Sequence, residues 1–308
     1  MIYVTQGHEK GIGLEVFIKS FLQLSPHEQK KFTLIAFKQS LIDTLHFLKI
    51  PFSFNKNILK IGLSVLKIDE PKSVDQYQST HCLIHALKII KRNDILFTLP
   101  TSKDQLYIKN KNQAGHTEFF RTYFKKKDIS MFFFSPNIKT LLITDHISLK
   151  EVGSKITPKL IESKINLVLS DSKKFHLGHF DEVLLSGINP HVGENGLLGK
   201  EDKKIFTALK SLRTQSSKTS FLGPFSGDTL SLHLNQEKQQ LLVYMFHDQG
   251  LSFFKSQMGL LGVNISLGLP FLRTSVDHGT AFELYGKNLA NFSGCLYVMK
   301  EMLKLKSR

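Results

Sequence analysis

The chain has 308 residues, of which 41% are hydrophobic and 22% are charged, so it is long enough for one large or two smaller folded domains. This composition excludes a disordered or fibrous protein. The formal net charge of +15 would suit nucleic acid, but the lysines are scattered in short groups and no nucleic-acid motif is present, so we expect a basic surface that recruits anionic substrates and no nucleic-acid partner.

The sequence shows no feature of secretion or of membrane insertion. The first residues, MIYVTQGHEKGIG, lack a basic stretch followed by an apolar run, so we expect no signal peptide. No stretch approaches the ~18 consecutive apolar residues of a membrane span. Cys82 and Cys295 have no partners at metal-site spacing, which fits a reducing compartment. We therefore expect a cytoplasmic protein without a membrane partner.

Short apolar runs typical of strands alternate with amphipathic stretches typical of helices. The predicted strands are Ile2–Thr5, Phe32–Phe37, Asp94–Leu99, Ser130–Phe134, Thr140–Thr144, Glu182–Ser186, Gln240–Phe246 and Val263–Leu267. The clearest predicted helices are Leu14–Leu24, Gln39–Leu48, Val74–Lys91, Thr157–Leu167 and Lys200–Leu212. This alternation predicts βαβ units, a largely parallel sheet and helices on both of its faces, which is a doubly wound α/β fold.

Three predicted strands each deliver a histidine to the same kind of position. TLLITDH ends at His146, VLLSGINPH leads to His191, and LVYMFHDQ runs into His247. Ligands of parallel α/β sheets bind beyond the carboxyl ends of the strands. Three imidazoles near a carboxylate would suit a catalytic divalent ion such as zinc. The alternative at each position is a hydrogen-bonded loop histidine, and the residues alone leave both interpretations open.

Two glycine-containing segments carry further candidates. AGHTEFF places His116 and Thr117 before a predicted helix, whose N-terminus would favour an anion, although Thr117 would also serve as an ordinary cap. In GVNISLGLPFLRTSVDHGTAFELYGK, glycines allow close approach of a ligand, and arginine supplies a planar fork for phosphate or carboxylate. The polar candidates in this segment are Asn264, Arg273, Asp277 and His278.

Other candidate residues have equally good structural interpretations. Lys255 is a compact cation that would bind an anion or form a surface salt bridge. Asp228, in GPFSGDTL, follows a predicted strand, where a turn aspartate is common. TQGHEKGIGLE has the glycines of a tight strand-to-helix turn, but it does not match GxGxxG and is a weak signal.

Several of these segments resemble one enzyme family. GHTEFF, GINPHVGENG, GPFSGDTL, FHDQGL and VNISLGLPFLRTSVDHGTAFEL are similar to motifs of the 4-hydroxythreonine-4-phosphate dehydrogenases of vitamin B6 biosynthesis, which have an isocitrate/isopropylmalate dehydrogenase-like fold. The resemblance is dense from Gly115 onward. It implies two doubly wound α/β/α domains with the active site in the cleft between them. We expect residues 1–117 and 280–308 to form the first domain, and 118–279 the second, which would carry most metal and substrate residues.

The resemblance also implies roles for individual residues. The metal ligands would be His146, His191 and His247, in a site shared across a homodimer interface. Substrate would be bound by His116, Thr117, Lys255, Asn264 and Arg273. The catalytic groups would be Lys255, Asp248 and Asp228. The nicotinamide cofactor would be bound by Asp277, His278, Gly279 and Thr280.

The implied reaction is the NAD- or NADP-dependent oxidation of 4-phosphohydroxy-L-threonine, followed by decarboxylation to 3-amino-2-oxopropyl phosphate. It would use one divalent metal, such as zinc, cobalt or magnesium, and would serve pyridoxal 5'-phosphate biosynthesis. The family usually begins with a turn resembling TPGDPAGIGPE, whereas this chain has TQGHEKGIGLE. The alternatives are a paralogous dehydrogenase of threonate or erythronate 4-phosphate, and a non-catalytic basic binding protein, against which the retained histidines argue.

Overall fold

The chain forms two compact units, which are described separately. The computed structural model describes residues 1–72 and 77–307. Unit 1 comprises Met1–Ile129 and Leu260–Arg308, and unit 2 comprises Ser130–Gly259. The unit boundaries therefore differ from those expected, because residues 118–129 and 260–279 belong to unit 1. In the described part of the chain, no helix is long and apolar enough to cross a membrane.

The strands of unit 1 form a mostly parallel arrangement. They are β1 (Ile2–Thr5), β2 (Phe32–Ile35), β3 (Ser53–Asn55), β4 (Ile58–Ile61), β5 (Ser64–Asp69), β6 (Ile95–Thr98), β14 (Val263–Leu267) and β15 (Leu272–Ser275). Their spatial order is β14-β15-β6-β1-β2-β5-β4-β3. The pairs from β15 to β5 are parallel, whereas β14 and the β3–β4–β5 meander add antiparallel edges. A separate small hairpin consists of β7 (Tyr107–Ile108) and β8 (Lys111–Asn112).

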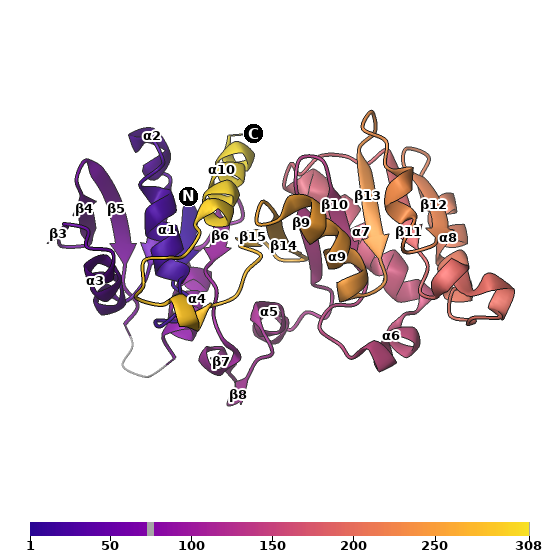
Figure 1. Cartoon of the computed structure of the whole chain (residues 1–308), viewed down its shortest axis with the longest axis horizontal. Helices are drawn as coiled ribbons and strands as arrows, with labels where there is room; N and C mark the ends of the chain where they lie inside the picture. The colour runs from indigo at the N-terminus through magenta and orange to yellow at the C-terminus, as the bar shows by residue number, and fades with distance from the viewer. Residues whose placement is uncertain (73–76, 308) are drawn as a thin grey trace. The chain divides into compact units, whose positions relative to one another are not determined.

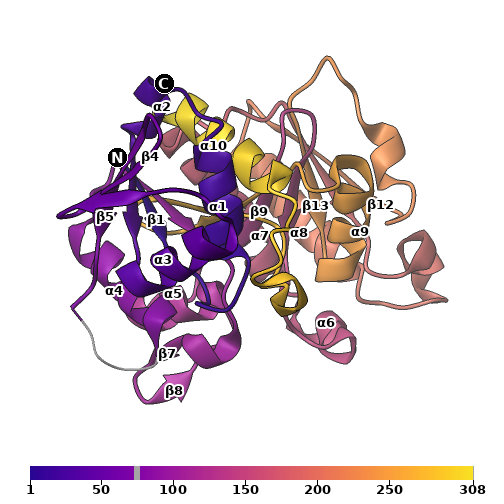
Figure 2. The same cartoon turned by 60° about the vertical axis from the view of Figure 1, so that its left-hand side comes forward.

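Helices cover both faces of the unit 1 sheet. They are α1 (Gly13–Phe21), α2 (Pro26–Gln29), α3 (Lys38–Phe47), α4 (Gln78–Ile89), α5 (His116–Phe124) and α10 (Ser293–Lys306). On one face, Phe32 of β2 meets Phe21 of α1 with ring centroids 6.4 Å apart. Helices α1 and α10 lie side by side there (Figure 1, Figure 2). Since side chains alternate along a strand, Ile35 and Leu96 point to the other face, where α4 and α5 pack.

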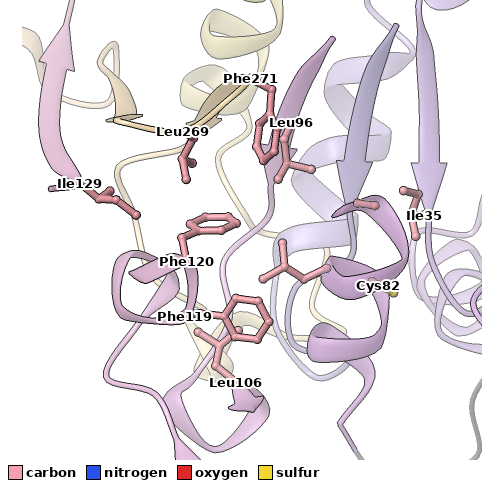
Figure 3. Close-up of a cluster of buried hydrophobic side chains, with 11 residues drawn as sticks. Ile35, Cys82, Leu96, Leu106, Phe119, Phe120, Ile129, Leu269 and Phe271 are labelled. Atoms are coloured by element: carbon pink, nitrogen blue, oxygen red, sulfur yellow. The ribbon is translucent and has the colours of Figure 1, made fainter. Parts of the chain in front are cut away.

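A buried cluster explains why the unit boundaries differ from the expected ones. Phe119 and Phe120 of α5 pack with Leu96 of β6, and Leu269 and Phe271 join the same cluster from the segment between β14 and β15 (Figure 3). Helix α5 and the β14–β15 pair therefore complete the core of unit 1. The expected boundary at residue 117 would have cut through this core.

The substitution Phe119→Ala is expected to lower the free energy of unfolding of unit 1 by about 3–5 kcal/mol, because it leaves a cavity in this cluster. The Phe119 side chain is 0% exposed. Urea unfolding measures the effect. Leu63→Ala, at a residue that is 97% exposed in the same unit, is the control and should change stability by less than about 0.5 kcal/mol. Equal stability of the two variants would contradict the assigned core.

The strands of unit 2 are also mostly parallel to one another. Its strands are β9 (Ser130–Phe134), β10 (Lys139–Leu142), β11 (Glu182–Ser186), β12 (Ser220–Phe225) and β13 (Gln240–Tyr244). Their order is β12-β11-β13-β10-β9, and only β9 is antiparallel to its neighbour within the unit. The carboxyl ends of β10, β13, β11 and β12 consequently lie at one edge of the sheet.

The helices of unit 2 complete a three-layer α/β/α arrangement. They are α6 (Leu149–Lys155), α7 (Pro158–Lys174), α8 (Lys203–Gln215) and α9 (His247–Met258). Phe254 of α9 packs on Leu142, Leu242 and Tyr244 of the sheet. The intervening residues of these strands point to the opposite face of the sheet. Helices α7 and α8 pack together there and against β9 and β12. The predicted doubly wound α/β class is confirmed.

Most predicted elements are present, but the segment after β13 differs from the prediction. Four strands, β1, β9, β11 and β14, have the predicted bounds. The predicted helix Val74–Lys91 corresponds to α4, and its residues 74–76 lie outside the described part. The predicted strand Gln240–Phe246 ends at Tyr244, and His247 begins helix α9, which was not among the predicted helices. Gly250 lies inside this helix, where a Cβ atom would lie 2.7 Å from Cδ2 of Leu142, so the glycine permits close helix–sheet packing.

Candidate active site

The carboxyl edge of the unit 2 sheet brings together residues from four strands. His146 follows β10, His191 follows β11, Asp228 follows β12, and His247 follows β13 and begins α9. Because these four strands are parallel neighbours, the residues after them share one edge of the sheet.

His146 and His247 are adjacent, with ring centroids 5.4 Å apart. Nδ1 of His247 lies 2.7 Å from Oδ1 of Asp248, which orients the ring and directs its Nε2 to another partner. A tetrahedral ion with Zn–N bonds of about 2.0–2.1 Å places two liganding imidazole centroids about 5 Å apart. The pair therefore fits a shared divalent ion in both donor type and separation.

His191 occupies a different environment. It begins a tight loop, Pro190–Gly196, in which residues 191–195 all have positive φ values, including 58° at the β-branched Val192. The backbone N–H of His191 donates to Oγ of Ser226 at 3.3 Å. Over residues 1–72 and 77–307, no three His, Cys, Asp or Glu side chains are grouped closely enough to hold a metal ion. The structure thus pairs two of the predicted ligands, and the third stays a prediction.

The loop carrying His191 is held by a buried carboxylate. Asp202 is 2% exposed and accepts hydrogen bonds from the backbone N–H of Ile188 at 2.7 Å and from that of Asn189 at 3.3 Å. It also accepts from Nδ2 of Asn189 at 2.8 Å. A run of left-handed residues persists only where its surroundings fix it, so Asp202 is a positioning residue for His191.

Asp228 lies in the loop beside His191. A hydrogen bond from the Ser226 hydroxyl, helped by backbone N–H groups and by His191, lowers the pKa of its carboxyl group. Asp228 is therefore ionised at neutral pH and is available as an acceptor or base.

The sequence assigned no role to Gln249, which connects the ends of two strands, β11 and β13. Its Oε1 accepts from the backbone N–H of Met245 at 2.9 Å and from Oγ of Ser186 at 3.1 Å, while its Nε2 donates to the carbonyl of Gly187 at 2.8 Å. Gly227 has room only for hydrogen, since a Cβ atom there would lie 2.5 Å from Nε2 of Gln249. This amide holds the ends of β13 and β11 in register. The sequence signal for this role was a third polar side chain directly after His247 and Asp248.

Lys255 lies on α9, eight residues after His247, and is exposed. At 1.5 Å per residue, the helix separates the two positions by about 12 Å along its axis. This separation favours contact with a distant anionic part of an extended substrate over proton transfer close to His247.

Unit 1 contains a second convergent group, centred on Arg273 of β15. Its side chain is 3% exposed, and its Nη1 and Nη2 donate to Oγ of Ser266 at 2.9 Å and to Oγ1 of Thr98 at 2.6 Å. Nε is buried without a hydrogen-bond partner. No carboxylate of the described residues pairs with this guanidinium, and burial lowers its pKa to about 9. A buried cation with neutral partners is costly unless an anion joins it.

Asn264 and His116 lie around this guanidinium. Asn264 of β14 pairs with Ser275 of β15, so it is diagonal to Arg273 on the same face, and its buried Oδ1 has no partner. His116 and Thr117 begin α5, and the Arg273 Cζ lies 5.7 Å from the ring centroid of Phe120, one turn further on. Burial, together with the charge of Arg273, holds the pKa of His116 well below its ordinary value. Unit 1 thus offers a helix N-terminus, a neutral imidazole and an open guanidinium donor to an anion.

The depressed pKa of His116 predicts a specific pH dependence of stability. Below about pH 6.5 the unfolded chain takes up a proton on His116 while the folded protein does not, so the free energy of unfolding falls as pH falls. The limiting slope is about 1.4 kcal/mol per pH unit. His116→Gln should flatten the fall measured by urea unfolding between about pH 7.5 and 5.5. His27→Gln, at an exposed residue of the same unit, should keep the wild-type slope. Identical slopes for wild type and His116→Gln would contradict the depressed pKa of His116.

The predicted nucleotide-binding segment lies against the N-terminal turn. The backbone N–H of Ile12 donates to the carbonyl of Thr280 at 3.0 Å. A Cβ atom on Gly7 would lie 1.9 Å from the carbonyl oxygen of Pro100, so this position requires glycine. His278 has a buried Nε2 without a partner, while its Nδ1 lies 3.0 Å from the carbonyl oxygen of Gly279. Asp277 is half-buried at the start of the same segment. The turn that was a weak sequence signal therefore lies beside a segment in which the buried Nε2 of His278 has no hydrogen-bond partner.

Comparisons with known proteins are consistent over nearly the whole chain. The family model described as pyridoxal phosphate biosynthetic protein PdxA matches residues 17–300. A 4-hydroxythreonine-4-phosphate dehydrogenase of Aquifex aeolicus (strain VF5) is 31% identical, covering 97% of this chain and 96% of that protein. A protein of Oceanobacillus iheyensis, provisionally named a D-threonate 4-phosphate dehydrogenase, is 30% identical over 99% of this chain and 97% of that protein.

Solved structures extend this likeness to the fold. A 4-hydroxythreonine-4-phosphate dehydrogenase from Klebsiella pneumoniae matches with a TM-score of 0.80 and 25% identity, over 99% of both chains. Isocitrate dehydrogenase from Methylococcus capsulatus matches with a TM-score of 0.51 and 12% identity, over 99% of this chain and 86% of that one, and shows the expected fold group alone. The chain therefore belongs to the pyridoxal phosphate biosynthetic protein PdxA family.

Proposed function

We propose that this protein oxidises the secondary alcohol of 4-phosphohydroxy-L-threonine with NAD or NADP. The resulting β-keto acid loses carbon dioxide to give 3-amino-2-oxopropyl phosphate, for pyridoxal phosphate biosynthesis. The observation that carries the proposal is the buried guanidinium of Arg273, whose Nε has no partner and which no described carboxylate neutralises. Relatives named as 4-hydroxythreonine-4-phosphate dehydrogenases support the choice of substrate.

The residues of unit 1 bind and orient the anionic substrate in this proposal. Arg273 donates from Nε to a phosphate or carboxylate oxygen, while Asn264 accepts a substrate hydrogen bond at its open Oδ1. His116, kept neutral by its depressed pKa, and Thr117 supply hydrogen bonds at the start of α5. Fixing the substrate in this way converts binding energy into orientation of the reacting carbon.

The residues of unit 2 act at the reacting hydroxyl. A divalent ion bound by His146 and His247 would stabilise the negative charge that develops on the substrate oxygen. Imidazole donors suit zinc and cobalt better than magnesium. Asp248 orients His247, and Asp228 is the ionised group placed to accept the hydroxyl proton. Lys255 contributes its positive charge to a distant part of the substrate.

The remaining roles follow the same proposal. Asp277, His278, Gly279 and Thr280, among which the buried Nε2 of His278 has no hydrogen-bond partner, would hold the nicotinamide cofactor, which would supply the hydride acceptor for the oxidation. A homodimer that shares the metal site between its copies would add a third ligand to the pair formed by His146 and His247. A cytoplasmic location suits the two free, buried cysteines.

The second candidate substrate is D-threonate 4-phosphate, which the name of the Oceanobacillus iheyensis relative favours. Steady-state NADH or NADPH formation with each substrate separates the two proposals. We expect kcat/KM for 4-phosphohydroxy-L-threonine to be at least about 100-fold higher, because correctly paired polar groups discriminate strongly. A higher kcat/KM for D-threonate 4-phosphate would overturn the main proposal and leave the dehydrogenase chemistry intact.

A further inference from the structure

Unit 2 has a pocket at the edge of its strands opposite to the histidines. The pocket has a volume of about 530 Å³. Lys139 and Gln240 in its wall begin β10 and β13, whereas His146 and His247 follow the carboxyl ends of these strands. Strands of this length separate the two edges by more than about 10 Å. The pocket is therefore distinct from the candidate active site.

Lys139 is a buried cation in this wall without a negatively charged partner. Its side chain is 7% exposed, and its ammonium donates to the carbonyl of Pro136 at 3.2 Å and to Oε1 of Gln239 at 2.8 Å. Both acceptors are neutral residues that also line the pocket. No carboxylate of the described chain forms an ion pair with Lys139, and burial lowers the pKa of its amine. An ammonium has three donors, so one is available to a ligand.

The rest of the wall combines amides with apolar side chains. The amides are those of Asn137, Asn235, Gln236, Gln239, Gln240 and Gln257. The apolar surface comes from Ile138, Leu234, Phe253 and Met258. The other lysine in the wall, Lys238, is already paired with Glu182, so Lys139 provides the uncompensated charge. A wall of this kind matches an anionic group joined to an apolar one.

We propose that this pocket binds a small organic anion, a carboxylate or phosphate ester with an apolar portion, whose charged group contacts the ammonium of Lys139. The amides of Gln239 and Gln257 hydrogen-bond its polar atoms, and Phe253 and Met258 pack against its apolar part. The site stands apart from the proposed dehydrogenase reaction and does not depend on it.

Benzoate, phenyl phosphate and neutral benzamide are suitable probes, because benzoate and benzamide differ mainly in charge. Isothermal titration gives the affinities, and NMR follows the side-chain amide signals of Gln239 and Gln257. We expect one or both anions to bind and to shift these signals, with affinity at least tenfold above that of benzamide. The comparison of benzoate with phenyl phosphate identifies the preferred anion.

Three variants test whether the anions bind in this pocket. Lys139→Met removes the charge and keeps the length of the side chain, and should lower anion affinity at least tenfold. Gln257→Glu adds a negative charge at an exposed wall position, where we expect the fold to persist, and should have a similar effect. Ser256→Glu makes the same charge change at the neighbouring exposed residue, which is outside the wall, and should bind like wild type.

Other results overturn the proposal. These are equal binding of benzoate and benzamide, an undiminished anion affinity in Gln257→Glu, or anion binding that leaves the Gln239 and Gln257 signals unshifted. The last result would place the bound anions outside this pocket. If Lys139→Met does not fold, Gln257→Glu decides the question alone.

Discussion

Arg273→Met is expected to lower kcat/KM for the phosphorylated substrate by about 10³-fold. The substitution removes a charge-assisted hydrogen bond from Nε, of about 1.5–3 kcal/mol, together with the attraction between the buried charge and the substrate anion, and the two together correspond to roughly 4 kcal/mol. Stability should change by less than about 2 kcal/mol, because the lost bonds to Ser266 and Thr98 are offset by removal of a buried charge. Steady-state kinetics and urea unfolding measure the two quantities separately.

Two further variants make this test specific. Arg273→Lys keeps the charge without the planar fork and should fall between wild type and Arg273→Met. Arg213→Met is the control. Arg213 lies in α8 and donates from Nε to the carbonyl of Phe221 in β12, so its loss should leave kcat/KM within about threefold of wild type. A wild-type kcat/KM in Arg273→Met would show that the buried guanidinium has a purely structural role.

His247→Ala is expected to lose most bound divalent metal and at least about 10³-fold in kcat. Removing one of two adjacent imidazoles leaves an incomplete donor set, and the stabilisation lost at the developing oxyanion amounts to several kcal/mol. The fold should persist, since His247 lies at the start of α9 and only part of its side chain is buried. Metal analysis after dialysis, together with kinetics, gives both results.

His179→Ala is the matched control in the same unit, because the side chain of His179 is 78% exposed and lies outside the strand ends. It should keep wild-type metal content and turnover. If His247→Ala retained both its metal and its kcat, His247 would be an ordinary loop histidine, which is the alternative that the sequence left open.

The sequence predicted the strands that carry the candidate site because their apolar runs are buried on both faces. β9, β11 and β14 match their predicted bounds, and the rule that ligands bind at carboxyl ends correctly grouped the positions of His146 and His247. Both inferences depend on local patterns, which a single sequence contains.

Features that depend on tertiary packing could not be predicted. Helix α9 begins shortly after β13 without a side-chain cap, and its interior Gly250 permits close packing on Leu142, which no local pattern indicates. The sequence indicates that Phe119 and Phe120 belong to an apolar helix face, but it does not indicate against which unit this face packs. The predicted boundaries therefore differ from those of the compact units. The left-handed loop at His191 depends on Asp202, which lies beyond the range of local motifs.

The sequence also could not predict that no described carboxylate pairs with Arg273. An arginine on a strand usually finds a carboxylate, and only the pairing of β15 with β14 and β6 brings Ser266 and Thr98 to Arg273 as its partners. Because both partners are neutral, the buried charge of Arg273 is the strongest indication of an anionic substrate.

Visible absorption of the Co²⁺-loaded protein tests most directly whether His146 and His247 bind a divalent ion at the site of reaction. We expect d–d bands typical of imidazole ligation that change when 4-phosphohydroxy-L-threonine is added, and that are absent in His247→Ala at the same Co²⁺ concentration. Bands that are the same in wild type and His247→Ala, or that do not respond to the substrate, would contradict this assignment.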